Sequence, residues 1–195
     1  MVVAIAEAPS LSLETFLAQP ETKPAKEYYQ GIITQKPMPK GKHSRIQSRL
    51  ARTIDQWAEE QKIALALTEL RCTFGDRSMV PDIAVMRWSH LPRDENGEIA
   101  DQFSQAPDWV IEILSPDQSV TLLMEKIIFC LNHGTELGWL IDPACKSITV
   151  FSVGLPQIYF AETDPQPPLP VMTGLEDWSI TAATIFAWLQ VGDRP

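Results

Sequence analysis

The sequence predicts an α/β fold in which a mixed β-sheet is flanked by helices. Strand-like and helix-like patterns alternate along the 195 residues in the order strand, helix, strands, helix, strands. Trp109–Leu114, with the letters WVIEIL, is nearly continuous in apolar residues, as strands are when a sheet is covered on both faces. No internal repeat interrupts this order, and the length suits one domain with a substantial core.

The N-terminal part of the chain is expected to be a leader, residues 1–26, rich in Pro, Ala and Glu. It contains a short helix predicted at Leu13–Gln19, for which Ser12 offers a cap. We expect one domain over 27–195, divided into a core (27–161) and a C-terminal connector with a helix (162–195).

The elements of the core follow from turn residues and from periodicity. Tyr28–Gln35 is expected to be a strand or hairpin that turns at Gly31. Ser44–Gln61 is predicted to be a helix because its apolar residues recur at helical spacing. The remaining elements, in order, are strands at Ile63–Leu70 and Val80–Trp88 around an FGDR turn at Phe74–Arg77, a polar loop at Leu91–Gln105, the strand Trp109–Leu114, a helix at Ser119–His133, strands at Leu137–Ile141, Ser147–Val153 and Gln157–Ala161, a Pro-rich connector at Asp164–Pro170, and a helix at Thr181–Gln190.

Composition favours a soluble, cytoplasmic protein without a membrane span. Three cysteines lie far apart and form no CxxC pair, which suits a reducing compartment. Met1–Ala6 has no basic residue, and its apolar run is too short for a signal sequence. No stretch of the sequence approaches the ~18 consecutive apolar residues of a membrane helix. Glycine-rich phosphate loops, GxSxG and HExxH are absent, so we expect no organic cofactor.

Charge is distributed unevenly along the chain. The formal net charge of -9 argues at first against a protein that binds nucleic acid without specificity. Between Tyr28 and Ile54, however, there is no Asp or Glu, and every charged residue is basic: Lys36, Lys40, Lys42, Arg45, Arg49 and Arg52. The three arginines share one helical face, which is either an ordinary solvated face or a surface that binds a phosphate backbone. If it binds a phosphate backbone, we expect Lys40, Lys42 and the three arginines to contact nucleic acid.

Three acids stand in or beside apolar strands, where solubility does not require them. Glu112 lies inside WVIEIL and Asp82 inside VPDIAV. If the two strands around the FGDR turn form a hairpin centred on Gly75 and Asp76, Glu69 lies directly opposite Asp82 on the same face. Such a group of carboxylates suits Mg²⁺ or Mn²⁺, whereas the alternative is that Asp82 bonds a turn and Glu112 pairs with a buried cation.

Two further residues are candidates for the same site. Lys126 lies at the border of the apolar face of the second helix, where it either extends to solvent or reaches over the sheet to Glu112. In the second case its charge could stabilise the transition state. His43 precedes the first long helix, on the side of the apolar residues, and is either a helix-start residue or a contact to phosphate or metal-bound water.

Four segments in this order resemble the Uma2 family (DUF820) of the PD-(D/E)xK nuclease superfamily. They are EYYQGIITQKPMPKGKHSRIQ, VPDIAV, PDWVIEILSPDQS and EKIIFCLNHGTELGWLIDP. The resemblance extends over about residues 27–153. The resemblance implies a restriction-endonuclease-like sheet flanked by helices, a divalent metal ion and phosphodiester hydrolysis. The superfamily lysine is absent, because Leu114 stands two residues after Glu112.

Carried over to this sequence, the resemblance implies that Asp82 and Glu112 bind the metal and that Lys126 replaces the missing lysine. Glu27 and His43 match family positions near the first helix and are expected to support the site. From these residues we expect a Mg²⁺-dependent (or Mn²⁺-dependent) DNA endonuclease with Asp82, Glu112 and Glu69 as metal ligands and, by analogy, a homodimer. The alternative is a catalytically inactive module on the same scaffold that binds nucleic acid or protein.

Overall fold

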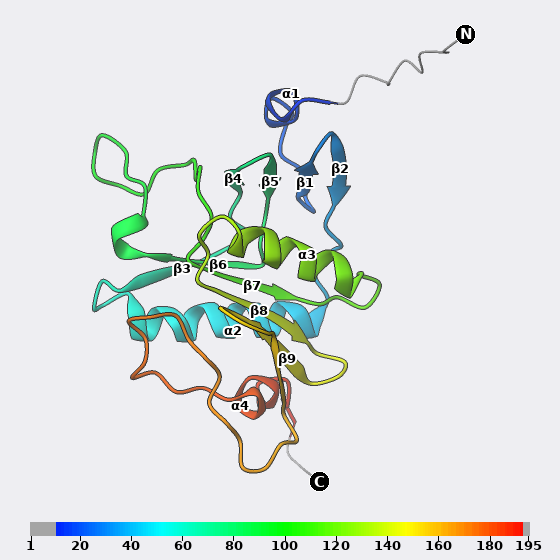
Figure 1. Cartoon of the computed structure of the whole chain (residues 1–195), viewed down its shortest axis with the longest axis vertical. Coiled ribbons are helices and arrows are strands. Elements are labelled where there is room, and N and C mark those ends of the chain that lie inside the picture. The colour runs from blue at the N-terminus through cyan, green and yellow to red at the C-terminus, as the bar shows by residue number, and fades with distance from the viewer. Residues whose placement is uncertain (1–10, 193–195) are drawn as a thin grey trace.

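The computed structural model describes residues 11–192 and contains two β-sheets and four α-helices (Figure 1). The larger sheet has the strand order β10-β9-β8-β7-β6-β3, in which only β7 and β8 are parallel. Its strands are β3 (Ala64–Thr68), β6 (Ile83–Arg87), β7 (Trp109–Ile113), β8 (Leu137–Asp142), β9 (Ser147–Phe151) and β10 (Gln157–Phe160). This is the mixed sheet that the sequence predicts.

A smaller antiparallel sheet, with the order β2-β1-β5-β4, accompanies the large one. Its strands are β1 (Lys26–Tyr29), β2 (Ile32–Gln35), β4 (Cys72–Phe74) and β5 (Arg77–Met79). β1 and β2 form the hairpin expected around Gly31, whose φ of 83° is available to glycine without strain. The second sheet was not predicted, because β4 and β5 have three residues each and are too short for a periodic pattern.

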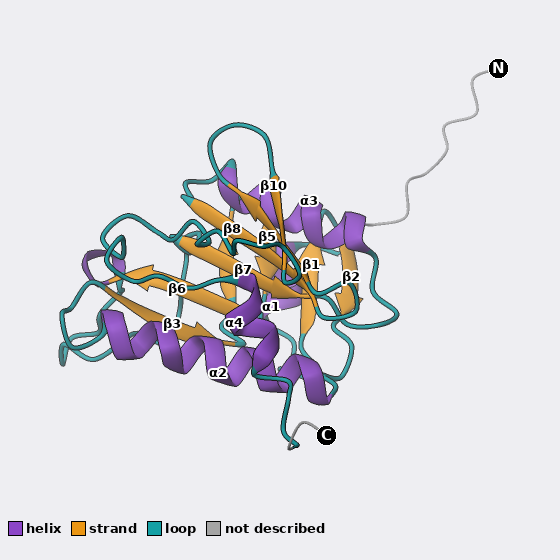
Figure 2. Cartoon of the chain, turned by 90° about the horizontal axis from the view of Figure 1, so that it is seen from below, coloured by secondary structure: helices purple, strands orange, loops and turns teal. Residues whose placement is uncertain are grey.

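The helices cover both faces of the large sheet. α2 (Gly41–Ala58) runs along one face together with α4 (Ala182–Ala187), and α3 (Val120–Leu131) lies on the other face with the small sheet (Figure 2). The first helix, α1 (Leu13–Leu17), is capped by Ser12 as expected, and a 3₁₀ turn (Trp88–His90) follows β6. α2 was predicted at Ser44–Gln61, and both of its ends lie three residues earlier. Lys40 is the residue that precedes its first turn.

Alternation along β7 decides which side chains reach which face. Trp109, Ile111 and Ile113 pack into the core beneath α2 and α4, whereas Val110 packs into the core beneath α3. Glu112 has the parity of Val110 and therefore lies on the α3 face. Gly138 of β8 lies under the same helix, where an added Cβ would stand 2.3 Å from Ile127 Cγ2, so glycine permits the close approach of α3.

The C-terminal segment completes the core on the α2 face. Leu169, Met172 and Trp178 of the connector are buried there, and so are Ile185 and Phe186 of α4. The last helix therefore packs into the core. Within residues 11–192, no helix is long and apolar enough to cross a membrane. The predicted absence of a signal at Met1–Ala6 falls outside the described residues.

Candidate active site

The three acids singled out in the sequence lie in one row across three strands of the large sheet. Thr68 pairs with Ile83, which places Glu69 opposite Asp82, and the backbone N–H of Glu69 donates to Asp82 O at 3.3 Å. Ile83 in turn pairs with Ile111, which places Asp82 opposite Glu112. Glu112 lies on the α3 face, whereas Asp82 and Glu69 stand just outside β6 and β3, at the ends of those strands. There they also reach side chains of α2, because His43 contacts Asp82 and Gln47 contacts Glu69. The register predicted from the FGDR turn is confirmed.

Asp82 is buried and is held by donors on every side. Its Oδ2 accepts hydrogen bonds from Ile113 N at 2.7 Å and from His43 Nε2 at 3.0 Å, and its Oδ1 accepts one from Lys36 Nζ at 2.7 Å. Burial raises the pKa of this carboxyl, but the hydrogen bond from His43 and the charge of Lys36 outweigh burial and hold the pKa well below its ordinary value. Asp82 is therefore an anion at neutral pH.

Glu112 is buried beside Lys126, as one of the two alternatives for that lysine predicted. Lys126 Nζ forms an ion pair with the buried Glu112 Oε1 at 2.7 Å, and no other donor contacts this oxygen. Burial raises the pKa of Glu112 to about 7, against the opposing charge of Lys126. The pKa of Lys126 is raised, because its two carboxylate partners outweigh burial.

Glu27 is the second carboxylate partner of Lys126 and links the two sheets. Its Oε1 accepts a hydrogen bond from Lys126 Nζ and another from Val80 N at 2.7 Å. Lys126 Nζ also donates to Val80 O at 3.3 Å. Glu27 therefore orients Lys126 toward Glu112, which is a supporting position of the kind that the family resemblance implied for it.

Lys36 is a charged residue of this site that sequence reasoning did not single out. Its ammonium contacts Glu69 and Asp82 together, although it follows β2 in a Pro-rich segment. In the sequence, Lys36 was notable only as one of the basic residues between Tyr28 and Ile54. Its partners Glu69 and Asp82 lie 33 and 46 residues away in the sequence, so no local pattern could place Lys36 beside them. The available signal was that two facing acids need a cation between them.

Asp82 and Glu112 also meet the conditions for a shared divalent ion. Mg²⁺ is commonly held by one or two carboxylates, with water and substrate phosphates as its other ligands. Asp82 and Glu112 stand on adjacent strands, and Glu112 Oε1 is buried without a hydrogen bond, so this pair fits such an ion. Among residues 11–192, no group of three or more His, Cys, Asp or Glu is arranged to hold an ion by itself. Glu69 instead faces Lys36.

Two cavities open beside these residues and meet at Lys36. The first has a volume of about 500 Å³ and is lined by His43, Gln47, Glu69 and Asp82, with the apolar wall Pro37, Met38 and Pro39. The second has a volume of about 540 Å³ and is lined by Glu27, Arg77, Gln118 and Lys126. Both cavities include Lys36 and Gln118 in their walls. Asp82 lines only the first and Lys126 only the second, and the buried Glu112 lines neither.

The basic residues expected to contact nucleic acid fall into two groups. Lys40 and Lys42 lie at the start of α2, next to His43, and Lys40 pairs with exposed Asp117 at 3.3 Å. Arg45 Nε donates to Trp188 O at 3.2 Å, and the guanidinium of Arg49 lies 5.8 Å from the centre of the Trp188 ring. These two arginines therefore contact the end of α4, while Arg52 is exposed further along the same helix.

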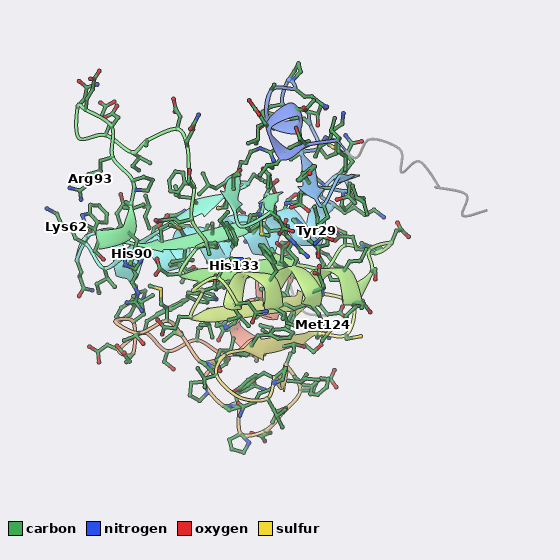
Figure 3. All side chains as sticks on the ribbon, turned by 45° about the horizontal axis from the view of Figure 1, so that its top comes forward. Tyr29, Lys62, His90, Arg93, Met124 and His133 are labelled. Carbon is green, nitrogen blue, oxygen red and sulfur yellow. The ribbon has the colours of Figure 1, made fainter. Side chains whose placement is uncertain are left out.

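Exposed groups at the far end of the large sheet lie away from the site. Lys62, His90 and Arg93 gather there, whereas Met124 of α3 and Tyr29 of β1 lie on the opposite side of the view (Figure 3). His90 Nδ1 bonds Asp108 Oδ1 at 2.8 Å, and His133 Nδ1 bonds Phe129 O at 2.8 Å. Neither histidine reaches the acid row, as expected from their positions in a loop and at a helix end.

The fold and the acid row define an α/β protein of the restriction-endonuclease-like class. The chain belongs to the Uma2 family, described as "Putative restriction endonuclease", whose model matches residues 13–183. It is similar to a solved structure from Anabaena variabilis ATCC 29413, titled as a putative nuclease of DUF820, with 48% sequence identity and a TM-score of 0.88. That similarity covers 92% of this chain and 99% of the other. A search of curated proteins gave no match. Family and neighbour together support a nuclease-type function.

Proposed function

We propose that this protein is a metal-dependent endonuclease that hydrolyses phosphodiester bonds of DNA. The observation that carries the proposal is the opposition of Asp82 and Glu112 on adjacent strands, with Lys126 Nζ 2.7 Å from Glu112. The nuclease-type family and the similar structure from Anabaena variabilis support it. A homodimer remains an expectation by analogy with related nucleases, to be measured by sedimentation.

Asp82 and Glu112 would hold the Mg²⁺ or Mn²⁺ ion, which when bound supplies an activated water and neutralises charge on the scissile phosphate. His43 holds Asp82 in its ionised form and in a fixed orientation. Lys126 is kept charged by Glu27 and Glu112 and places that charge beside the acid pair, where it offsets negative charge that develops in the transition state. Lys126 thus takes the role of the superfamily lysine, whose position is occupied here by Leu114.

Plasmid nicking with and without divalent ions tests this function. Supercoiled DNA is incubated with the protein in Mg²⁺, in Mn²⁺ and in EDTA, and a structured RNA is run in parallel to decide between DNA and RNA. We expect Asp82→Ala and Glu112→Ala to lower the cleavage rate by about a hundredfold or more. The matched control is Asp101→Ala, which removes an exposed carboxylate of the polar loop. Variants of Asp82 and Glu112 that cut as fast as wild type would refute the assignment.

A second candidate function is a catalytically inactive module that binds nucleic acid or protein. The observation that favours it is that both acids already pair with buried lysines, Asp82 with Lys36 and Glu112 with Lys126. Calorimetry separates the candidates. Binding of Mn²⁺ that is lost in both alanine variants supports the enzyme, whereas no heat of binding at millimolar Mg²⁺ or Mn²⁺ supports the module.

A further inference from the structure

The ammonium of Lys36 lies in a cradle of oxygens that has the form of a cation site. Nζ is 2.7 Å from Asp82 Oδ1, 2.9 Å from Val80 O, and 3.1 Å from both Glu69 Oε1 and Glu69 Oε2. An ammonium has three protons, so these four oxygens exceed the number of hydrogen bonds that it can donate. The Lys36 side chain is only 10% exposed, which means that the cradle encloses it.

The oxygens of this cradle are positioned by groups other than Lys36. Gln47 Nε2 donates to Glu69 Oε1 at 3.0 Å and to Asp82 O at 2.8 Å. The peptide of Val80 is fixed through its N–H, which donates to Glu27. Asp82 is fixed through Oδ2, which accepts from Ile113 N and His43. The cradle is therefore organised independently of the lysine that occupies it.

We propose that Lys36 is a built-in second cation of the active site, which stands where a two-metal nuclease would hold its second ion. In two-metal sites, two divalent ions lie about 3.5–4 Å apart and clamp the two oxygens of the reacting phosphate. Here Asp82 serves both positions, because Oδ1 contacts Lys36 while the same carboxylate lies opposite Glu112. The position of the first ion, on Asp82 and Glu112, rests on the function proposed above. The wild-type site thus needs one divalent ion where a two-metal site needs two.

Charge and access support this role for Lys36. Its ammonium lies 2.7 Å from Asp82 Oδ1 and 3.1 Å from Glu69 Oε1, so two carboxylates stabilise its positive charge. Lys36 lines both cavities of the site, whereas Lys126 lines only the second. A strand bound through both cavities would pass directly over the Lys36 ammonium. Lys126 is buried to a similar degree and lies between Glu27 and Glu112, at the second cavity alone.

Removing the ammonium while keeping its oxygens tests the proposal. Lys36→Ala leaves the carboxylates of Glu69 and Asp82 and the carbonyl of Val80 facing an open position. We expect this variant to bind one more Mn²⁺ per chain than wild type, as counted by isothermal titration calorimetry. Lys146→Ala is the control, since it removes the same charge from an exposed position. It should bind the wild-type number of ions. Adding Glu69→Gln to Lys36→Ala should weaken the additional Mn²⁺ at least tenfold.

Thermal melting provides a second measurement, because the variant has two facing acids without their cation. Lys36→Ala should melt lower than wild type in EDTA and should gain more in melting temperature on addition of Mn²⁺. A variant that folds only with Mn²⁺ also supports the proposal. A variant that binds the wild-type number of ions, or stays unfolded in saturating Mn²⁺, overturns it.

The outcome is separable from that of the proposed nuclease function. If wild type binds no ion and Lys36→Ala binds one, the second-cation role of Lys36 stands and the site on Asp82 and Glu112 fails. If wild type nicks DNA with Mg²⁺ but Lys36→Ala gains no ion, the nuclease function stands and Lys36 is only an ion-pair partner.

Discussion

Asp82 connects the stability of the protein to pH. Its pKa is lower in the folded chain than in the unfolded chain, so its contribution is fully present above the unfolded value of 3.8 and is lost as pH falls below it. We expect Asp82→Asn to lower the free energy of unfolding at pH 7 by about 3 kcal/mol or more, since Lys36 loses a buried partner. The variant should also lose much of the dependence on pH between about 5 and 2.

Urea denaturation at several pH values measures both effects. Asp101→Asn is the control, because it removes an exposed carboxylate and should leave the stability and its pH dependence close to wild type. A slope for Asp82→Asn that equals the wild-type slope would show that the acid sensitivity arises elsewhere.

Variants at positions 114 and 126 test whether Lys126 replaces the superfamily lysine, whose position is occupied by Leu114. Lys126→Met should abolish nicking and should also destabilise the chain, because Glu112 and Glu27 are left without their partner. A lysine at position 114 would start on the same strand face as Glu112. We therefore expect Lys126→Met with Leu114→Lys to regain part of the nicking rate on plasmid. A double variant as inactive as Lys126→Met would mean that position 114 cannot supply the charge.

At the residue scale, the sequence predicted the acids better than their partners. Glu69 and Asp82 could be aligned because the turn at Gly75 fixes the register of the strands that flank it, whereas Glu112 was placed only by its position inside an apolar strand. Lys126 followed from its place on an amphipathic helix. Lys36 could not be found in this way, because it is not in a helix or strand and its partners are distant in sequence.

At the scale of elements, the contact between α3 and β8 depends on the absence of one side chain. Gly138→Ala would place Cβ 2.3 Å from Ile127 Cγ2, so the helix must shift. We expect a loss of about 1–3 kcal/mol in the free energy of unfolding, measured by urea denaturation. Gly41→Ala is the control, since no atom lies within 4 Å of its added Cβ, and it should be neutral or slightly stabilising.

The two ends of α2 are expected to differ in nucleic-acid binding. Lys40 and Lys42 lie beside the cavities, whereas Arg45 and Arg49 contact Trp188. Two variants with equal change in charge, Lys40→Ala/Lys42→Ala and Arg45→Ala/Arg49→Ala, can be compared by fluorescence anisotropy with labelled DNA over a range of salt. We expect the lysine pair to reduce the salt slope by about one for each phosphate that the variant no longer neutralises, and the arginine pair to reduce it less. The opposite order would place the DNA along the arginine face.

Element boundaries were predictable where caps mark them and less so elsewhere. Ser12 accepts a hydrogen bond at the start of α1, as predicted, and Ser119, the predicted first residue of the next long helix, caps α3. α2 has no side-chain cap, and its predicted start was three residues late. The bend that carries the chain from β3 into the small sheet occurs at Glu69, whose φ of 53° has no sequence signature in a residue of this type.

At the scale of the whole molecule, the C-terminal connector and helix, which were expected to follow the core within the same domain, supply part of that core. Truncation after residue 161 would expose the α2 face where Leu169, Met172, Trp178 and Phe186 are buried. Burial of each such side chain contributes about 1.5–3 kcal/mol, and the sum approaches the roughly 5–15 kcal/mol that stabilise a typical domain. We expect the truncated chain to lack cooperative unfolding in circular dichroism melts, whereas a chain truncated after residue 192 should unfold as wild type does. A cooperative transition in the shorter chain would confine the domain to 27–161.

The hairpin around Gly75 restricts how the length of this chain can change. Cys72 pairs with Met79 in the small sheet and Thr68 pairs with Ile83 in the large sheet, in one continuous register. One residue inserted between Gly75 and Asp76 would force that register to slip or the turn to bulge, and a slip would turn the side chains of one strand to the opposite face. Glu69 would then no longer lie opposite Asp82, although the insertion lies about six residues from either acid. Within the polar loop, Phe103 is buried and bridges to Cys72, but Asp94–Glu98 is exposed and bonded only to itself. We therefore expect an insertion at Asp94–Glu98 to cost the site little.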